Sequence, residues 1–176
     1  MDPIDELKEH AEKAHDPFDR RVGASMAIIA AVLALVAVSG HVSTTEELLS
    51  QQKASDQWAF YQAKSLRRYQ SEVAHDLLAT MGNPAAAKLE EKYSGSIERY
   101  EKEGEEIQNR AQELERESEL SGHKALRLHL GEIFLEMALV LASLAILTKR
   151  APIWLAALAT SSLGALIAAS IFLIRG

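Results

Sequence analysis

Three long runs with almost no charge dominate this sequence of 176 residues. Residues 22–42 and 151–174 contain no Asp, Glu, Lys or Arg, and residues 130–148 contain only Glu132 and Glu136. A helix needs about 20 apolar residues to cross about 30 Å of hydrocarbon, and each run has roughly that length. The sequence therefore predicts three transmembrane helices at these positions, which excludes a soluble cytosolic enzyme.

The remainder of the chain is also expected to be helical. The four prolines, at positions 3, 17, 84 and 152, all fall where a segment would begin, and the alternation typical of strands is missing. The first apolar run is longer than the 7–15 residues typical of a cleaved signal peptide, which favours an uncleaved signal anchor.

A charged segment, residues 43–129, separates the first two spans and holds 16 acidic and 12 basic residues. Gly82 and Asn83 favour the end of a helix, and Pro84 can open the next one. A tip at residues 81–84 leaves arms 43–80 and 85–129, whose similar lengths suit two helices that both return to the membrane. The predicted fold class is an all-α membrane protein, with three transmembrane helices and a long extramembrane antiparallel helical hairpin (coiled coil).

The second arm of this hairpin carries a heptad pattern. Its small and apolar residues recur at alternating spacings of three and four between dense charges, which favours a coiled coil over a single amphipathic helix on a core. The first arm is less regular and is apolar on two faces, so it is expected to contact both its hairpin partner and a neighbouring subunit. The predicted hairpin or oligomer seam consists of Ile97, Tyr100, Gly104, Ile107, Ala111, Leu114 and Leu128 on the second arm and of Leu66, Tyr69 and Val73 on the first.

Basic residues near the spans predict the orientation in the membrane. Arg20 and Arg21 precede the first span, and Lys149 and Arg150 separate the second from the third. Both pairs lie on one side if the N-terminus is cytoplasmic, as the positive-inside rule prefers. The hairpin is then outside, in the periplasm if the source is bacterial. An amphipathic segment over residues 1–21, with a net charge of −3, is not expected to bind anionic lipid.

The third span contains small residues at fourfold spacing. Such rows allow two helix backbones to approach closely in lipid. The residues expected to pack in this way are Ala157, Ser161, Gly164, Ala165 and Ala168.

Two carboxylates stand inside the second span. Glu132, Glu136 and His129 share one helix face, and His41 closes the first span at a similar depth. Because ionisable groups are rare in membrane helices, one hypothesis is an ion or proton site. The alternative is structural: Glu132 reaches the interface or pairs with Arg127 or His41, and Glu136 is protonated and hydrogen-bonded.

Other kinds of chemistry find little support. The chain has no cysteine, which excludes disulfides, thiolate zinc sites and cysteine nucleophiles. Its net charge of −6 argues against nucleic-acid binding. Motifs of hydrolases, phosphate-binding loops and metalloproteases are missing from the sequence. We therefore expect no catalytic residue, no metal, no cofactor and no enzyme activity.

Two stretches, residues 55–64 (SDQWAFYQAK) and 140–150 (VLASLAILTKR), carry a family resemblance. With one span before the hairpin and two after it, the chain resembles an uncharacterised family of bacterial membrane proteins that is known only as a domain of unknown function. The resemblance extends from about Ala14 onward and implies a setting in the bacterial inner membrane. It implies no activity, cofactor or site residue.

Three functions are compatible with these patterns. The leading hypothesis is a homo-oligomeric, membrane-anchored structural or scaffolding protein that assembles through its hairpin. The alternative is an oligomeric ion or proton channel or transporter that uses Glu136 and Glu132. The third is an adaptor that binds a protein partner, not identifiable from the sequence, through the hairpin tip.

Overall fold

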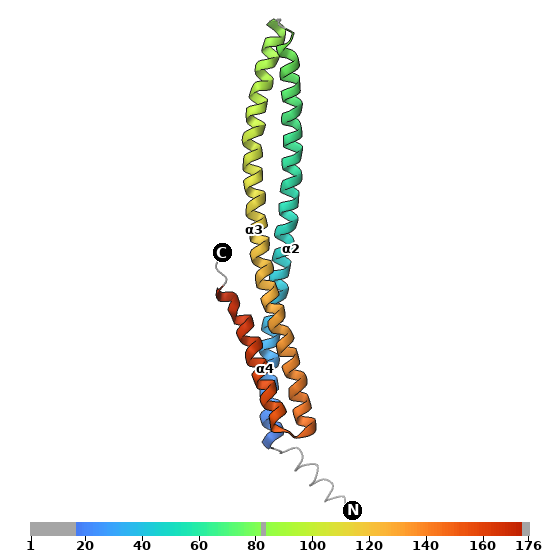
Figure 1. Ribbon diagram of the computed structural model, residues 1–176, viewed down its shortest axis with the longest axis vertical. Helices are drawn as coiled ribbons and strands as arrows, with labels where there is room; N and C mark the ends of the chain where they lie inside the picture. Colours follow the sequence, from blue (N-terminus) through green and yellow to red (C-terminus); the bar gives the residue numbers. More distant parts are fainter. Residues whose placement is uncertain (1–16, 82–83, 174–176) are drawn as a thin grey trace, which may run out of the picture. The chain divides into compact units, whose positions relative to one another are not determined.

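The computed structural model describes residues 17–81 and 84–173, and it is helical almost throughout. Figure 1 shows the helices α2 (Pro17–Ala79), α3 (Pro84–Thr148) and α4 (Ala151–Ala169), the last followed by a short 3-10 helix, η1 (Ser170–Leu173). Within the described residues there is no β-strand, so the all-helical class is confirmed. Most of the N-terminal segment predicted over residues 1–21, and Gly82 and Asn83 of the predicted tip, lie outside the described residues.

Local sequence explains where the helices begin and end. Pro17 and Pro84 open α2 and α3, where a missing N–H carries no penalty. At the end of α2, the N–H groups of Thr80 and Met81 bond back to the carbonyls three residues earlier, at 3.2 and 3.0 Å. Lys149 adopts a left-handed conformation, with φ 54°, which allows the chain to turn from α3 into α4 within two residues.

Each of the three helices contains a stretch long and apolar enough to cross a membrane. The most apolar windows of α2, α3 and the Ala151–Phe172 helix have mean hydropathies of 2.5, 2.1 and 1.9. Both α2 and α3 continue as helix beyond the expected spans, since they are 63 and 65 residues long. The boundaries of the spans within these helices stay predictions.

The chain divides into two compact units, and α2 and α3 contribute to both. We call the described residues 17–44 and 122–173 the bundle unit, and residues 45–81 and 84–121 the hairpin unit. In the bundle unit, α2, α3 and α4 pack on one another, and in the hairpin unit the antiparallel α2 and α3 lie side by side (Figure 1).

The core of the bundle unit is built from two apolar clusters. One includes Ile29, Leu128 and Leu135, and the other includes Val22 and Ala142. Small residues bring α4 close to α3 in this unit. Of the residues expected to pack there, Ala157, Ser161, Gly164 and Ala168 are buried and Ala165 is partly buried.

One end of the bundle unit is held by polar contacts between α2 and the start of α4. Lys149 forms an ion pair with Asp19. The indole N–H of Trp154 donates to Ser25 Oγ at 3.1 Å, and the Trp154 ring meets Phe18 edge to face at 6.1 Å. These contacts bring the basic residues before the first span and those between the second and third spans to the same end of the unit.

Candidate functional site

In the hairpin unit, α3 presents its heptad residues to α2. Gly104 is buried, and Ile107, Ala111 and Leu114 are only 8, 0 and 3 % exposed. The Ile97 and Tyr100 side chains, further along the same row, are partly exposed. Leu128, the last residue of the predicted row, is 3 % exposed and belongs to the bundle unit.

The face of α2 that meets this row is small or polar. Ala54 and Ser71 are its buried residues in the hairpin unit, at 3 and 7 % exposure. The Tyr61 ring fills the space above Gly104, because a Cβ placed on that glycine would lie 3.6 Å from the ring. Lys64 reaches across to Glu103 and forms an ion pair. Polar and small contacts therefore supply much of the pairing between the two arms.

The large apolar residues of this part of α2 lie on the opposite side. Leu66, Tyr69 and Val73 are 59, 55 and 69 % exposed. Their assignment to the seam within the hairpin was therefore wrong. The three residues share one side of α2, and that side points away from α3. Their use as an oligomer seam stays a prediction. We call these three residues the outer face of α2.

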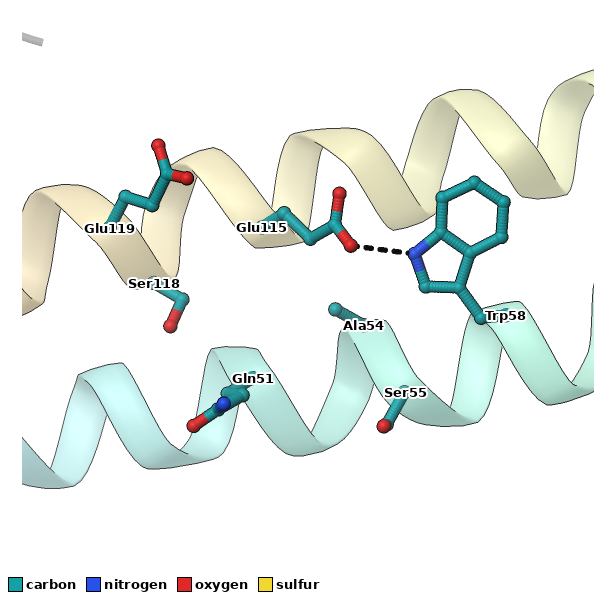
Figure 2. A pocket seen from close by; sticks show the side chains of 7 residues that line it. All are labelled: Gln51, Ala54, Ser55, Trp58, Glu115, Ser118 and Glu119. Carbon is teal, nitrogen blue, oxygen red and sulfur yellow. Dashed lines mark hydrogen bonds between the residues drawn. The ribbon is translucent and has the colours of Figure 1, made fainter.

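A groove of about 460 Å³ opens between the two arms near Trp58 (Figure 2). The indole N–H of Trp58 donates to a carboxylate oxygen of Glu115 at 2.7 Å, and Ser118 donates from its hydroxyl to the carbonyl of Glu47 at 3.0 Å. Figure 2 shows the short side chains of Ala54 and Ser118 between the two helices, with the longer Trp58 and Glu115 beside them. The groove is thus a gap between small seam residues, bridged by hydrogen bonds between the arms.

Ion pairs on the hairpin shift the acidity of the groups they join. The pKa of the Glu103 carboxyl is lowered, chiefly by the hydrogen bond from Lys64. The pKa of Glu98 is lowered by its hydrogen bond from Lys102, at 2.7 Å, and the pKa of Lys102 is raised by the same contact. Both carboxylates are stabilised in the charged form at neutral pH.

In the bundle unit, a polar cluster links α2 to α3. The His129 ring nitrogen Nε2 lies 3.1 Å from Thr44 Oγ1, and Nδ1 lies 3.1 Å from a Glu132 carboxylate oxygen. The His41 ring meets the His129 ring edge to face, with centroids 6.1 Å apart. Gly40 makes room for this arrangement, because a Cβ there would come within 3.2 Å of the His129 ring.

The cluster therefore contains three of the four residues predicted to form an ion or proton site. The fourth, Glu136, is one turn further along α3 and is exposed. Arg127 donates to the backbone and hydroxyl oxygens of Ser170, at 3.3 and 3.1 Å. In the part of the chain that the structure describes, no group of three His, Asp or Glu side chains has a geometry that would hold a metal ion.

Sequence reasoning missed two members of this cluster. Thr44 and Gly40 lie on the same face of α2, four residues apart. They could have been found by asking which residues of α2 lie opposite His129 in an antiparallel hairpin. A glycine there lets the ring approach, and a hydroxyl there can donate a hydrogen bond to the ring or accept one from it. Without the register of α2 against α3, that pairing was not accessible.

Comparison with known proteins yields a family and no function. The family model described as Domain of unknown function (DUF4337) matches residues 18–174. No curated protein and no solved structure matches the chain.

Proposed function

This chain belongs to the DUF4337 family, and we propose that it is a membrane-anchored structural protein that self-associates through its hairpin unit. The outer face of α2 carries the proposal. In the hairpin unit the buried residues of α2 are an alanine and a serine, whereas Leu66, Tyr69 and Val73 are more than half exposed. A helix that turns its larger apolar side chains away from its own partner has a face suited to a second contact.

Burial of this face against a second copy of the same chain is energetically favourable. Burying a large apolar side chain fully contributes about 1.5–3 kcal/mol. Three side chains that are already partly covered contribute roughly half of that each, or about 2–4.5 kcal/mol per copy. Two copies that bury the same face against each other double the gain. Confinement of both copies to one membrane raises their effective concentration and reduces the entropy lost on association.

The setting that we propose is the bacterial inner membrane, with the N-terminus in the cytoplasm. Three apolar helices support the membrane anchor. The clustering of Arg20, Arg21, Lys149 and Arg150 at one end of the bundle unit supports a cytoplasmic position for that end under the positive-inside rule. The hairpin unit then lies on the periplasmic side.

The test is the subunit number of the full chain in mild detergent, measured by native mass spectrometry. We expect an oligomer for the natural sequence and a smaller species for Leu66→Glu combined with Val73→Glu, because two charges would be buried in the contact. Leu89→Glu is the matched control, since Leu89 is 46 % exposed on the other arm, and it should leave the mass unchanged. A monomer before any substitution would refute the proposal.

The exposure of Glu136 within an apolar span favours a second candidate, an ion or proton channel formed by several copies. Acidic side chains that ring an oligomer axis are a known basis of cation selectivity. Proton or cation flux into proteoliposomes that is lost in Glu136→Gln would support it. Flux no greater than in empty liposomes would count against it.

A further inference from the structure

A row of polar side chains runs along α3 in the bundle unit. His129, Glu132, Glu136 and Ser143 follow one another at spacings of three, four and seven residues, which places them on one side of the helix. The rest of the predicted span, residues 130–148, contains no other charged residue. Leu139 and Val140 separate Glu136 from Ser143, but carboxylates within a helix of this hydropathy still mark a side that faces protein or water rather than lipid.

The first half of the row links α3 to α2. His129 and Glu132 bond to each other, and His129 also contacts Thr44 on α2. In the second half, the Ser143 hydroxyl donates to the carbonyl of Leu139 on its own helix, at 2.9 Å. Glu136 and Ser143 are exposed. Within residues 17–81 and 84–173, the carboxyl of Glu136 makes no hydrogen bond or ion pair.

Apolar side chains surround this exposed carboxyl on α3. Ile133, Met137 and Val140 are 50, 51 and 69 % exposed. A charged carboxylate at the centre of a membrane helix costs about 2.5–3.5 kcal/mol on insertion scales. An uncharged carboxyl still presents a donor and an acceptor that lipid tails cannot satisfy. A partner with hydrogen-bonding groups at the same depth removes that cost.

A second copy of this chain meets this condition without further assumption. Copies inserted in the same orientation hold identical residues at identical depths. A twofold axis along the membrane normal then sets Glu136 opposite Glu136 and Ser143 opposite Ser143, as in any isologous contact. Two uncharged carboxyls can donate to and accept from each other, and polar side chains of this kind stabilise helix pairs in membranes.

We propose that the spans of two copies associate along this row, with an intermolecular hydrogen bond between Glu136 side chains at the centre of the contact. This inference rests on the proposed function in one respect: in both, the partner is a second copy of the chain. The surfaces are different: this one is on α3 in the bundle unit, and the outer face of α2 is in the hairpin unit.

Because the chain contains no cysteine, single-cysteine crosslinking in membranes can test the contact directly. Ser143→Cys places a thiol in the row, and Leu155→Cys is the matched control. These positions lie six residues before and six residues after Lys149, and Leu155 is 60 % exposed on α4. With a membrane-permeant oxidant, we expect the dimer yield of Ser143→Cys to exceed that of Leu155→Cys several-fold.

A second substitution examines the role of the carboxyl. In the Ser143→Cys background, Glu136→Gln should keep most of the dimer, since an amide also donates and accepts, whereas Glu136→Leu should lower the yield several-fold. Equal yields for Ser143→Cys and Leu155→Cys, or a yield unchanged by Glu136→Leu, would overturn the inference. Leucine is fully compatible with a membrane helix, so a loss caused by unfolding is not expected.

A parallel reporter separates this result from that of the proposed function. Gln62→Cys is exposed and lies four residues before Leu66. Crosslinking at position 62 without crosslinking at position 143 keeps the hairpin assembly and refutes the contact between spans. The reverse pattern keeps the contact between spans and refutes assembly through the outer face of α2.

Discussion

Gly131 and Gly164 show how single residues determine the packing of the bundle unit. A Cβ added to Gly164 would lie 2.8 Å from the Gly131 carbonyl oxygen and 2.9 Å from the Cβ of Phe134. Backbone atoms of α3 cannot yield without moving the helix, so the contact between α3 and α4 requires a residue without a side chain. Gly131 was not identified from the sequence, because it stands alone outside any small-residue row.

Gly164→Ala is therefore expected to destabilise the bundle unit by about 1–3 kcal/mol, the usual cost of overpacking. The measurement is the thermal unfolding midpoint in detergent, followed by circular dichroism. Gly23→Ala is the control, since a Cβ at Gly23 meets nothing within 4 Å, and it should leave the midpoint unchanged or raise it. A Gly164→Ala midpoint equal to that of the natural sequence would show that the two helices do not approach this closely.

The ion pair between Lys64 and Glu103 predicts a pH dependence of the hairpin. The pKa of Glu103 is lowered from its model-compound value of 4.5. A lowered pKa in the folded state contributes stability that is complete above about pH 4.5 and is lost as the pH falls through the folded-state value. Hydrogen exchange over residues 45–121 should therefore become faster as the pH falls below about 4.5, after correction for the intrinsic pH dependence of exchange.

Glu103→Gln identifies the group responsible. It should exchange faster than the natural sequence at pH 7 and lose less protection on acidification. Glu117→Gln is an exposed change on the same helix and should behave like the natural chain. An acid response that is the same in Glu103→Gln and in the natural chain would assign the effect to other carboxyls.

At the scale of helices, the inner side of the hairpin depends on α3. Leu114 is 3 % exposed against α2, and truncation of a buried leucine to alanine costs about 2–5 kcal/mol. Leu114→Ala is expected to speed hydrogen exchange throughout residues 45–121, because the two arms lose a large side chain that is buried between them. Leu89→Ala removes a half-exposed leucine from the same helix and should have a much smaller effect.

This prediction changes what a substitution at Leu114 can report. The sequence pattern alone assigned Leu114 and Ile107 to a seam of the hairpin or of an oligomer, so a charge at either position could have been used to test oligomerisation. Both side chains are buried within one chain's hairpin unit, so the direct consequence is local unfolding. Retained protection in Leu114→Ala would show that the arms are held together without this seam.

The two long helices also show how far periodicity can predict contacts. On α3 the buried residues Ile107, Ala111 and Leu114 follow the heptad rule, and their spacing was visible in the sequence. On α2 the residues that face α3 are Ala54, Tyr61 and Lys64, which do not form an apolar pattern. Periodicity locates the most apolar side of a helix, and on α2 that is not the side facing its partner. The full set of residues around His129 could not be predicted from periodicity either, because it depends on the register of α2 against α3.

At the scale of the molecule, the distribution of charge predicts a topology that can be measured. Lys149 and Asp19 pair at one end of the bundle unit, so Arg20, Arg21 and Arg150 gather there as well. Basic residues next to a span are retained in the cytoplasm. Every crossing of the membrane reverses the side, so the hairpin unit, one span later, is expected on the other side.

Cysteine labelling can check this topology, because single-cysteine variants of this cysteine-free chain carry one reactive site each. In intact bacterial cells whose outer membrane has been made permeable, a membrane-impermeant maleimide should label Ser94→Cys, which is exposed on α3 in the hairpin unit. It should leave Arg150→Cys unmodified until the inner membrane is disrupted. The opposite pattern would place the basic end outside and the hairpin in the cytoplasm. Assembly through the outer face of α2 would survive that reversal, because the contact depends on burial of apolar surface, but its partners would then be cytoplasmic. Labelling of both positions in intact cells would contradict the span between them, which is predicted at residues 130–148 of α3.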